Sequence, residues 1–459
     1  MSYFWNLDLT EACSVAFTDE CGRNLSYADV NKEVELFSAL LPSNRSLVLL
    51  KVRNDIASVI AYLACLRNDH PLIMVDSDLN EGLTNKLYLT YQPNLIIEGP
   101  KIHVKHQRQL QLAPELAVML STSGSTGSPK LVRLSKENLQ HNANSIVVYL
   151  GLTDNEVAIT TMPLHYSFGL SILNSHLTAG AKIVLTSSSL ISKEFWHLVE
   201  GESVTSLSGV PYIFQMLKKM RYERFNTNSV RYLTQAGGRL DNETLSYFYQ
   251  QCSIKNQKFY VMYGQTEATA RISYLPCERL SDKLGSIGIP IPGGELTIRD
   301  IDNGIVTEPH VEGELFYKGP NVMLGYAESL SDLSLGDHHA GVLQTGDLGY
   351  QDIDGYFYIT GRSKRFIKIY GLRVSLDAVD NILADSGFSA AATGIDDKLF
   401  IFIEGRRPDG FLQEVVALIS TTLKINVNSI AVHCVDIIPR MANGKVNGKA
   451  LSDLMGQYE

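Results

Sequence analysis

The chain has 459 residues, more than one ordinary domain needs and enough for two or three. Hydrophobic residues make up 45% of it, which is typical of a soluble globular protein, and the net charge of −9 gives no reason to expect nucleic-acid binding. The six cysteines lack zinc-ligand or redox-pair spacing, the N-terminus lacks signal-peptide features, and no apolar stretch reaches the length of a membrane span. These features predict a cytoplasmic protein without a membrane span.

The first two thirds of the chain alternate short apolar runs with longer amphipathic stretches. The predicted strands are residues 46–52, 71–75, 116–121, 157–161, 181–186, 230–234 and 258–262. The predicted helices include residues 57–67, 136–149 and 242–252. Strands that alternate with helices are typical of parallel sheets covered by helices.

The pattern changes after about residue 284, where Gly and Pro separate short alternating runs that predict a small antiparallel sheet or barrel. From about residue 363, predicted strands and helices mix as in a small α+β domain, and the absence of a long linker favours a short hinge near residues 361–365. The sequence therefore predicts an α/β protein with two domains. A large N-terminal domain (1–362) would hold several subdomains, with parallel sheets and a small β subdomain, and a small α+β C-terminal domain (363–459) would follow on the hinge.

The strongest local motif is Ser121-Thr-Ser-Gly-Ser-Thr-Gly-Ser-Pro-Lys130, directly after an apolar run. Glycines let a backbone approach a phosphate, while hydroxyl groups, N–H groups and Lys130 can contact its oxygens. The spacing differs from that of a P-loop, because Pro129 precedes the lysine. Taken by itself, such a loop is more often a surface turn.

Three further motifs follow in the chain. In Tyr263-Gly-Gln-Thr-Glu267, an aromatic ring can stack on a purine, and the threonine and glutamate can hold a phosphate oxygen and Mg²⁺. In Thr345-Gly-Asp347 a carboxylate can accept ribose hydroxyl groups, and Arg362 follows it. The segment 439–449 is rich in Gly and Lys. Each motif alone also fits an ordinary turn or a solvated tail.

Together and in this order, the four motifs resemble those of the acyl-adenylate-forming (AMP-binding) superfamily: acyl- and aryl-CoA synthetases, peptide-synthetase adenylation domains and luciferases. The resemblance covers nearly the whole chain and implies ATP-dependent activation of a carboxylic acid as acyl-AMP, followed by transfer to a thiol. It implies ATP and Mg²⁺ as cofactors.

The resemblance also implies which residues contact the phosphates. The β- and γ-phosphates would be held by Thr122, Ser123, Gly124, Ser125, Thr126, Gly127 and Lys130. Thr266 would contact the α-phosphate and Glu267 would bind Mg²⁺. Lys445 would bridge the acyl carboxylate and the α-phosphate as pyrophosphate leaves, so Lys445, Thr266 and Glu267 are the predicted catalytic residues.

For the nucleoside, the resemblance places Gly237 and Gly238 along one face of adenine and Tyr263 along the other. Asp347 would accept the ribose hydroxyl groups, assisted by Arg362.

The C-terminal domain would swing about Lys364 between the two half-reactions. The swing would remove Lys445 and bring the face around Gly371 to the site, where a residue without a side chain lets a pantetheine arm pass.

The sequence departs from the family pattern at three places. Leu131 follows the Pro-Lys pair where the family often has Gly, and Lys136 stands near the usual position of a His. In Pro163-Leu-His165-Tyr166-Ser-Phe168 the histidine is shifted by one position, so a buried structural role for His165 is an equal alternative.

The segment 163–170 usually lines the acyl pocket, so His165, Tyr166 and Phe168 are the predicted substrate-binding residues. It holds no acid that could pair with an α-ammonium group, and a buried ammonium without a counter-charge is costly. We therefore expect a small carboxylic acid without an α-amine. The acceptor would be coenzyme A or the phosphopantetheine of a separate acyl carrier protein. The alternatives are an amino-acid-activating enzyme and a non-catalytic nucleotide-binding relative.

Overall fold

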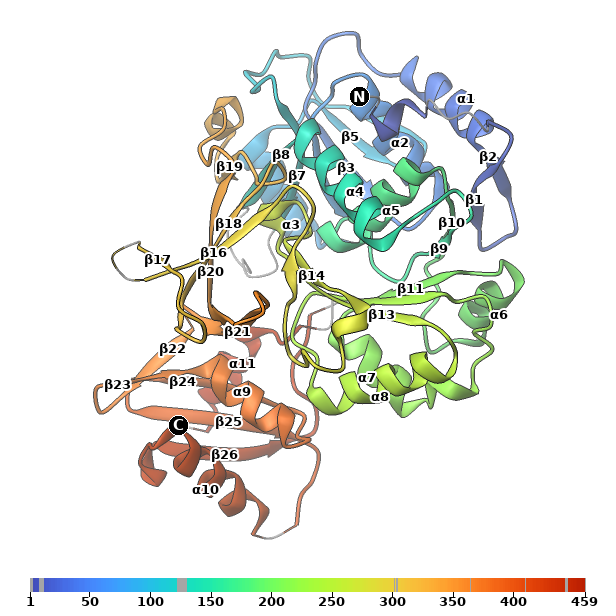
Figure 1. The fold of residues 1–459 in the computed structure, drawn as a ribbon. Coiled ribbons are helices and arrows are strands. Elements are labelled where there is room, and N and C mark those ends of the chain that lie inside the picture. The colour runs from blue at the N-terminus through green and yellow to red at the C-terminus, as the bar shows by residue number, and fades with distance from the viewer. Residues whose placement is uncertain are drawn as a thin grey trace.

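The computed structural model describes residues 3–7, 12–121, 130–300, 302, 304–363, 365–408, 410–441 and 445–458. Two large sheets, a smaller antiparallel sheet and a C-terminal α+β unit make up the molecule (Figure 1). No helix among these residues has the length and apolar content that a membrane crossing requires.

The first large sheet has seven strands, with a parallel centre formed by β7, β4, β3 and β5. Its strand order is β19 (Gly325–Ala327), β8 (Leu131–Ser135), β7 (Leu116–Ser121), β4 (Leu72–Asp76), β3 (Val48–Val52), β5 (Leu95–Glu98) and β6 (Lys101–Val104). Strand β8 was not predicted from the sequence. It pairs antiparallel with β7, so the sheet is mixed at this edge.

The second large sheet has nine strands, and six of them, from β13 to β1, are parallel neighbours. Its order is β15 (Ile289–Pro290), β14 (Ser273–Leu275), β13 (Lys258–Tyr263), β12 (Tyr232–Gln235), β11 (Ser206–Gly209), β9 (Val157–Ile159), β10 (Lys182–Leu185), β1 (Val15–Asp19) and β2 (Asn24–Ser26). The predicted α/β class with parallel sheets is confirmed.

Helices connect the parallel strands and cover the sheets (Figure 1). They are α1 (Tyr27–Ser38), α2 (Ile56–Arg67), α3 (Glu81–Tyr91), α4 (Lys136–Leu150), α5 (Ser167–Ala179), α6 (Lys193–Gly201), α7 (Pro211–Lys219) and α8 (Asn242–Ile254). Local sequence sets the ends of α4: Ser135 accepts a hydrogen bond from the backbone N–H of Asn138, and Gly151 ends the helix with φ +66°. The largest hydrophobic cluster joins α2, α4 and α5 to strands of both sheets.

A five-stranded antiparallel sheet follows, in agreement with the predicted small β subdomain. Its order is β17 (Ile305–Val306), β16 (Glu295–Arg299), β18 (Gly313–Lys318), β20 (Val342–Gln351) and β21 (Phe357–Arg362).

The C-terminal elements, coloured orange to red, lie at the bottom of Figure 1. They are the hairpin β22 (Phe366–Ile369) and β23 (Leu372–Ser375), the sheet β24 (Ala390–Ile395), β25 (Lys398–Glu404) and β26 (Ile430–Val435), and helices α9 (Leu376–Asp385), α10 (Phe411–Leu423) and α11 (Gly448–Met455). A hydrophobic cluster within residues 367–432 forms the core of this α+β unit.

Candidate active site

Tyr263, Asp347 and Arg362 meet in one hydrogen-bonded group. Strand β13 ends at Tyr263, while the pairing of β20 with β21 sets Asp347 opposite Arg362. The Tyr263 hydroxyl donates to Oδ2 of Asp347, and Nε of Arg362 donates to Oδ1 at 3.0 Å. Burial raises the pKa of Asp347, whereas Arg362 and Tyr263 act to lower it, so the two partners favour the carboxylate form of a side chain that is 5% exposed.

Thr266 and Glu267 lie in a 3₁₀ turn directly after β13. Oε1 of Glu267 accepts a hydrogen bond from the Tyr326 hydroxyl at 2.9 Å, and Oγ1 of Thr266 lies 3.3 Å from Oγ of Ser167 at the start of α5. Gly264 is required at this turn, because an added Cβ would lie 1.8 Å from the backbone oxygen of Ala270. The turn therefore presents a hydroxyl group and a carboxylate at the end of a buried strand.

Lys445 lies beside this group, although it comes from the C-terminal unit. Burial lowers the pKa of its ammonium group and the charge of Arg362 adds to this effect, while Glu267 and Asp347 act to raise it. The ammonium group is thus within electrostatic reach of two carboxylates and a guanidinium of the N-terminal region. By contrast, Lys449 is exposed on α11.

Gly237 and Gly238 follow β12, the parallel neighbour of β13, so they lie at the carboxyl edge of the same sheet as Tyr263. Gly237 has φ +87°, and an added Cβ would lie 3.0 Å from Cγ1 of Val210. The side chain of Gln235 donates to the backbone oxygen of Gly238 at 2.8 Å. Ligands of open parallel sheets bind at this edge.

The loop between β7 and β8 is described only from Lys130 onward, so the predicted contacts of residues 122–127 lie outside the described residues. Nζ of Lys130 lies 3.8 Å from the centroid of the Tyr326 ring and 3.5 Å from Oε1 of Glu328. Tyr326 therefore stands between Lys130 and Glu267. The sequence analysis missed Tyr326, because only the pairing of β19 with β8 brings it to the site.

The predicted substrate-binding residues lie in two different places, with His165 and Tyr166 together and Phe168 apart from them. His165 is 9% exposed, with Nε2 3.7 Å from Oδ2 of Asp76, and its ring packs against Tyr166 at 4.4 Å between centroids. Burial lowers the pKa of His165, while Asp76 opposes this shift. Phe168 instead packs against the guanidinium of Arg271, whose Cζ lies 4.2 Å from the ring centroid.

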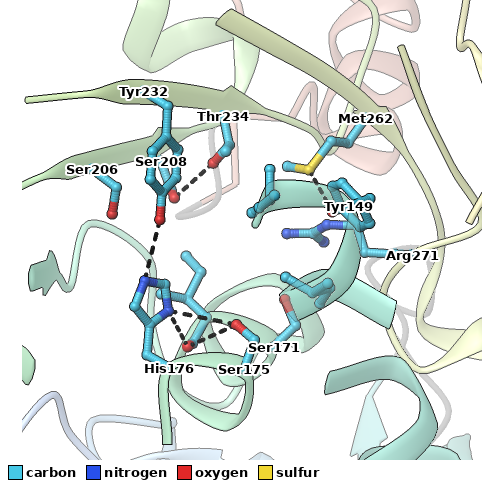
Figure 2. Close-up of a pocket in the computed structure, with 13 residues that line it drawn as sticks. Tyr149, Ser171, Ser175, His176, Ser206, Ser208, Tyr232, Thr234, Met262 and Arg271 are labelled. Atoms are coloured by element: carbon cyan, nitrogen blue, oxygen red, sulfur yellow. Dashed lines mark hydrogen bonds between the residues drawn. The ribbon is translucent and has the colours of Figure 1, made fainter. Parts of the chain in front are cut away.

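A cavity lies between helices α4 and α5 and strands β11, β12 and β13, and Arg271, which packs against Phe168, lines it (Figure 2). Its lining is rich in hydroxyl groups and includes one guanidinium. The lining residues are Ile146, Tyr149, Leu150, Ser171, Ile172, Ser175, His176, Ser206, Ser208, Tyr232, Thr234, Met262 and Arg271. The sequence analysis missed this set, because two helices, three strands and the segment after β13 each contribute only a few of its side chains. The one available signal was the position of Arg271, four residues after Glu267.

The predicted hinge Lys364 lies outside the described residues. Gly371 forms the turn between β22 and β23 with φ +86°, and no atom of the described residues lies within 4 Å of the position that a Cβ would take. Lys136, which stands near the family's histidine position, pairs instead with Asp69 at 2.9 Å.

Comparison with known proteins identifies the family to which this chain belongs. The model of the AMP-binding enzyme family matches residues 91–327. A 2-succinylbenzoate–CoA ligase from Bacillus cereus is 30% identical over 307 residues, which are 66% of this chain and 62% of the relative, so the match spans less than two thirds of that relative's length. A ligase of the same name from Bacillus cytotoxicus is 26% identical over 451 residues, 94% of this chain and 91% of the relative.

Solved structures share the fold. The o-succinylbenzoate CoA synthetase from Bacillus subtilis, in complex with its acyl-adenylate intermediate, aligns over 98% of each chain with a TM-score of 0.81 and 22% identity. ATP-bound MatB from Rhodopseudomonas palustris aligns over 99% of each chain with a TM-score of 0.81 and 20% identity. Because the family match covers more than half of the 459 residues and includes the Tyr263–Glu267 motif, the chain belongs to the AMP-binding enzymes, the acyl-adenylate-forming superfamily that its motifs resemble.

Proposed function

We propose that this chain activates a carboxylic acid as its acyl-AMP, using ATP and Mg²⁺ and releasing pyrophosphate, and then transfers the acyl group to the thiol of coenzyme A. The observation that carries this proposal is the position of Lys445 within electrostatic reach of Glu267 and Asp347. A protein that only binds a nucleotide does not need this cation, whereas a reaction that moves negative charge onto a leaving group is accelerated by one.

The nucleoside would bind at the carboxyl ends of β12 and β13. Gly237 and Gly238 would lie along one face of the adenine and the Tyr263 ring along the other. Asp347 would accept the ribose hydroxyl groups. Its hydrogen bonds from Tyr263 and Arg362 support this role, because they hold the carboxylate in one orientation.

Glu267 fits a Mg²⁺ ion shared with the nucleotide, because Mg²⁺ in such sites takes one or two carboxylates together with phosphate oxygens. The hydrogen bond from Tyr326 orients the Glu267 carboxylate. When bound, the ion would neutralise charge on the phosphates. Lys130 and the loop residues 122–127 would hold the β- and γ-phosphates.

In the first half-reaction, an oxygen of the acyl carboxylate attacks the α-phosphorus, and the bond to the bridging oxygen breaks with its electron pair going to pyrophosphate. Thr266 would contact the α-phosphate through its hydroxyl group. Lys445 would contact both the carboxylate and the α-phosphate, so it orients the two reactants and stabilises the charge that develops between them.

We further propose that residues 1–362 and 363–459 act as two domains, with Lys364 as the hinge and Gly371 at the thiol-binding face. Strand β21 ends at Arg362 and β22 begins at Phe366, which leaves a short connection, and the C-terminal unit has its own core. The second half-reaction would use a conformation in which Lys445 has moved away.

The acid would lack an α-amine, because residues 163–170 hold no carboxylate for an ammonium group. The substrate in the names of the relatives, 2-succinylbenzoate, has no amine either, and those names identify CoA as the acceptor. The phosphopantetheine of a carrier protein carries the same thiol and is the second acceptor to test. We propose the cytoplasm as the compartment, supported by the six unpaired cysteines.

The test is pyrophosphate release with ATP, Mg²⁺ and a panel of acids that includes 2-succinylbenzoate and amino acids paired with their deaminated analogues. We expect release with acids that lack the amine, and thioester formation when CoA is added. A consistent preference for the amino acids would replace the proposal with amino-acid activation. ATP binding without release for any acid would favour the non-catalytic nucleotide-binding relative.

A further inference from the structure

Arg271 is a buried cation in the cavity beside the reaction site. It is 3% exposed, and its backbone oxygen accepts a hydrogen bond from Nδ2 of Asn321 at 2.8 Å, which holds the residue in place. Its guanidinium lies against the Phe168 ring, and Figure 2 shows it directed toward the interior of the cavity. Ser171 lines the cavity and lies one turn of α5 after Ser167, whose Oγ is 3.3 Å from Oγ1 of Thr266, so the cavity lies close to the turn that would hold the α-phosphate.

The guanidinium of Arg271 has no carboxylate partner among the residues that the structure describes. Among the described residues, no carboxylate forms an ion pair with it, and its Nε atom is buried without a hydrogen-bond acceptor. Burial lowers the pKa of the Arg271 guanidinium, and its polar neighbour is the hydroxyl group of Tyr149. Because burial raises the pKa of Tyr149 to about 12, that hydroxyl is neutral at physiological pH. An arginine stays protonated in proteins, so within the described part of the chain this buried charge is uncompensated.

A buried arginine that only supports the fold looks different in this protein. Arg133 is 0% exposed, and its guanidinium donates to the backbone oxygens of Tyr326, Leu324, Leu335 and Gly336. Backbone carbonyl groups thus satisfy the donors of Arg133, whereas the donors of Arg271 face a cavity. The contrast indicates that Arg271 is placed for a ligand rather than for packing.

The rest of the lining is neutral. Nδ1 of His176 lies 2.8 Å from the backbone oxygen of Ile172, which can only accept, so Nδ1 carries the proton. Burial lowers the pKa of His176 to about 4, so this ring is uncharged at neutral pH. The other polar groups are hydroxyl groups, such as those of Ser208 and Thr234, which lie 2.7 Å apart. Arg271 is therefore the one charged side chain among the 13 lining residues of Figure 2.

We propose that Arg271 determines acid specificity by binding a second carboxylate of the substrate, which would make the substrate class dicarboxylic acids activated at the other end. This inference rests on the proposed adenylation function. A planar guanidinium binds a carboxylate through two parallel hydrogen bonds, and a buried pair of this kind supplies the charge that Arg271 lacks. The same cation repels an ammonium group, which adds a second reason against amino-acid substrates.

The test compares matched acids with the wild-type protein and three variants. Glutarate, adipate and isophthalate are each paired with their monoamide, which keeps size and shape but removes one charge, and kcat/KM is measured by pyrophosphate release. We expect the wild type to prefer the diacid at least tenfold. Arg271→Gln should lower this ratio at least tenfold, and Arg271→Lys should lower it less because the charge remains. Arg279→Gln removes a partly exposed guanidinium that pairs with Asp282 and does not line the cavity, so it should leave the ratio as it is.

ATP affinity and melting temperature report whether each variant is folded. The inference is overturned if the wild type prefers the monoamide in every pair, or if Arg271→Gln leaves the ratio unchanged. If pyrophosphate is released with the monoamides at a rate that does not depend on Arg271, the binding of a second carboxylate is refuted but the adenylation function is kept. Absence of release for every acid, in this series and in the broader panel, would refute the adenylation function and the present inference with it.

Discussion

Nη2 of Arg239 lies 2.9 Å from Oδ2 of Asp385, which joins the loop after β12 to the last residue of α9. The pair connects the adenine side of the proposed site with the C-terminal unit. A carboxylate at the C-terminal end of a helix is unfavourable, because the helix dipole is negative there, and Arg239 offsets this effect. The ion pair thus stabilises the arrangement in which Lys445 lies beside Asp347.

Arg239→Ala should therefore slow acyl-AMP formation while leaving thioester formation from isolated acyl-AMP unimpaired. Both side chains are about one third exposed, so we expect a loss of only about 0.2–1 kcal/mol, or up to about fivefold in rate. Asp385→Ala should have the same effect, and the double variant should lose no more than either single one. Additive losses would show that the two residues act separately.

Lys445→Ala should reduce acyl-AMP formation by about 10²–10³-fold, the range for loss of one donor that stabilises transition-state charge. ATP affinity should change little, because the nucleoside contacts come from other residues. Lys449→Ala is the matched control, since that lysine is exposed on α11. If the Lys449 variant lost activity and the Lys445 variant kept it, the catalytic lysine would be misassigned.

As pH rises, the rate of acyl-AMP formation should begin to fall at a lower pH than it would if Lys445 had the pKa of an ordinary lysine. Burial and the charge of Arg362 lower the pKa of Lys445, and Glu267 and Asp347 only oppose the shift. The ammonium form is present below this pKa and is lost as pH rises through it, so activity should decline before pH ~10.4. A pH–rate profile of pyrophosphate release measures this, with Lys445→Arg as the comparison that keeps its charge. A rate that stays constant up to that pH would contradict the expectation.

Asp347→Asn should weaken ATP binding by roughly 10–100-fold, because a hydrogen bond to a charged group contributes about 1.5–3 kcal/mol. Tyr263→Phe keeps the ring that would contact adenine but removes the hydroxyl donor to Asp347, so its effect should be smaller. Titration with ATP in the absence of acid measures both. Equal losses in the two variants would indicate that the Tyr263 hydroxyl contacts the nucleotide directly.

Tyr326→Phe should raise the Mg²⁺ concentration needed for half-maximal activity by about tenfold, the lower end for loss of a partner that orients a metal ligand. The reason is the 2.9 Å hydrogen bond from Tyr326 to Oε1 of Glu267. Glu267→Gln removes the ligand charge itself and should have the larger effect. An unchanged Mg²⁺ dependence in both variants would remove this pair from the metal site.

Much of the fold was readable from the sequence because its signals are local. Strand β7 begins and ends at the predicted residues, helix α2 ends at the predicted residue 67, and helices α4 and α8 begin at the predicted residues 136 and 242, since apolar period, caps and glycines lie within the segment itself. The order of four motifs along the chain identified the family, because each motif is a short stretch with its own turn chemistry. The absence of an acid in residues 163–170 likewise needed no coordinates.

Only the tertiary structure decided which residues from distant parts of the chain become neighbours. Strand β8 pairs antiparallel with β7 and carries Arg133 into a ring of carbonyl oxygens. Strand β8 also pairs with β19, and this second pairing brings Tyr326 between Lys130 and Glu267. Among the described residues, Arg271 is buried without a carboxylate partner because the segment after β13 packs against residues of α4 and α5. Burial, desolvation and the sum of nearby charges depend on residues distant in the chain, so no pattern within a segment could reveal them.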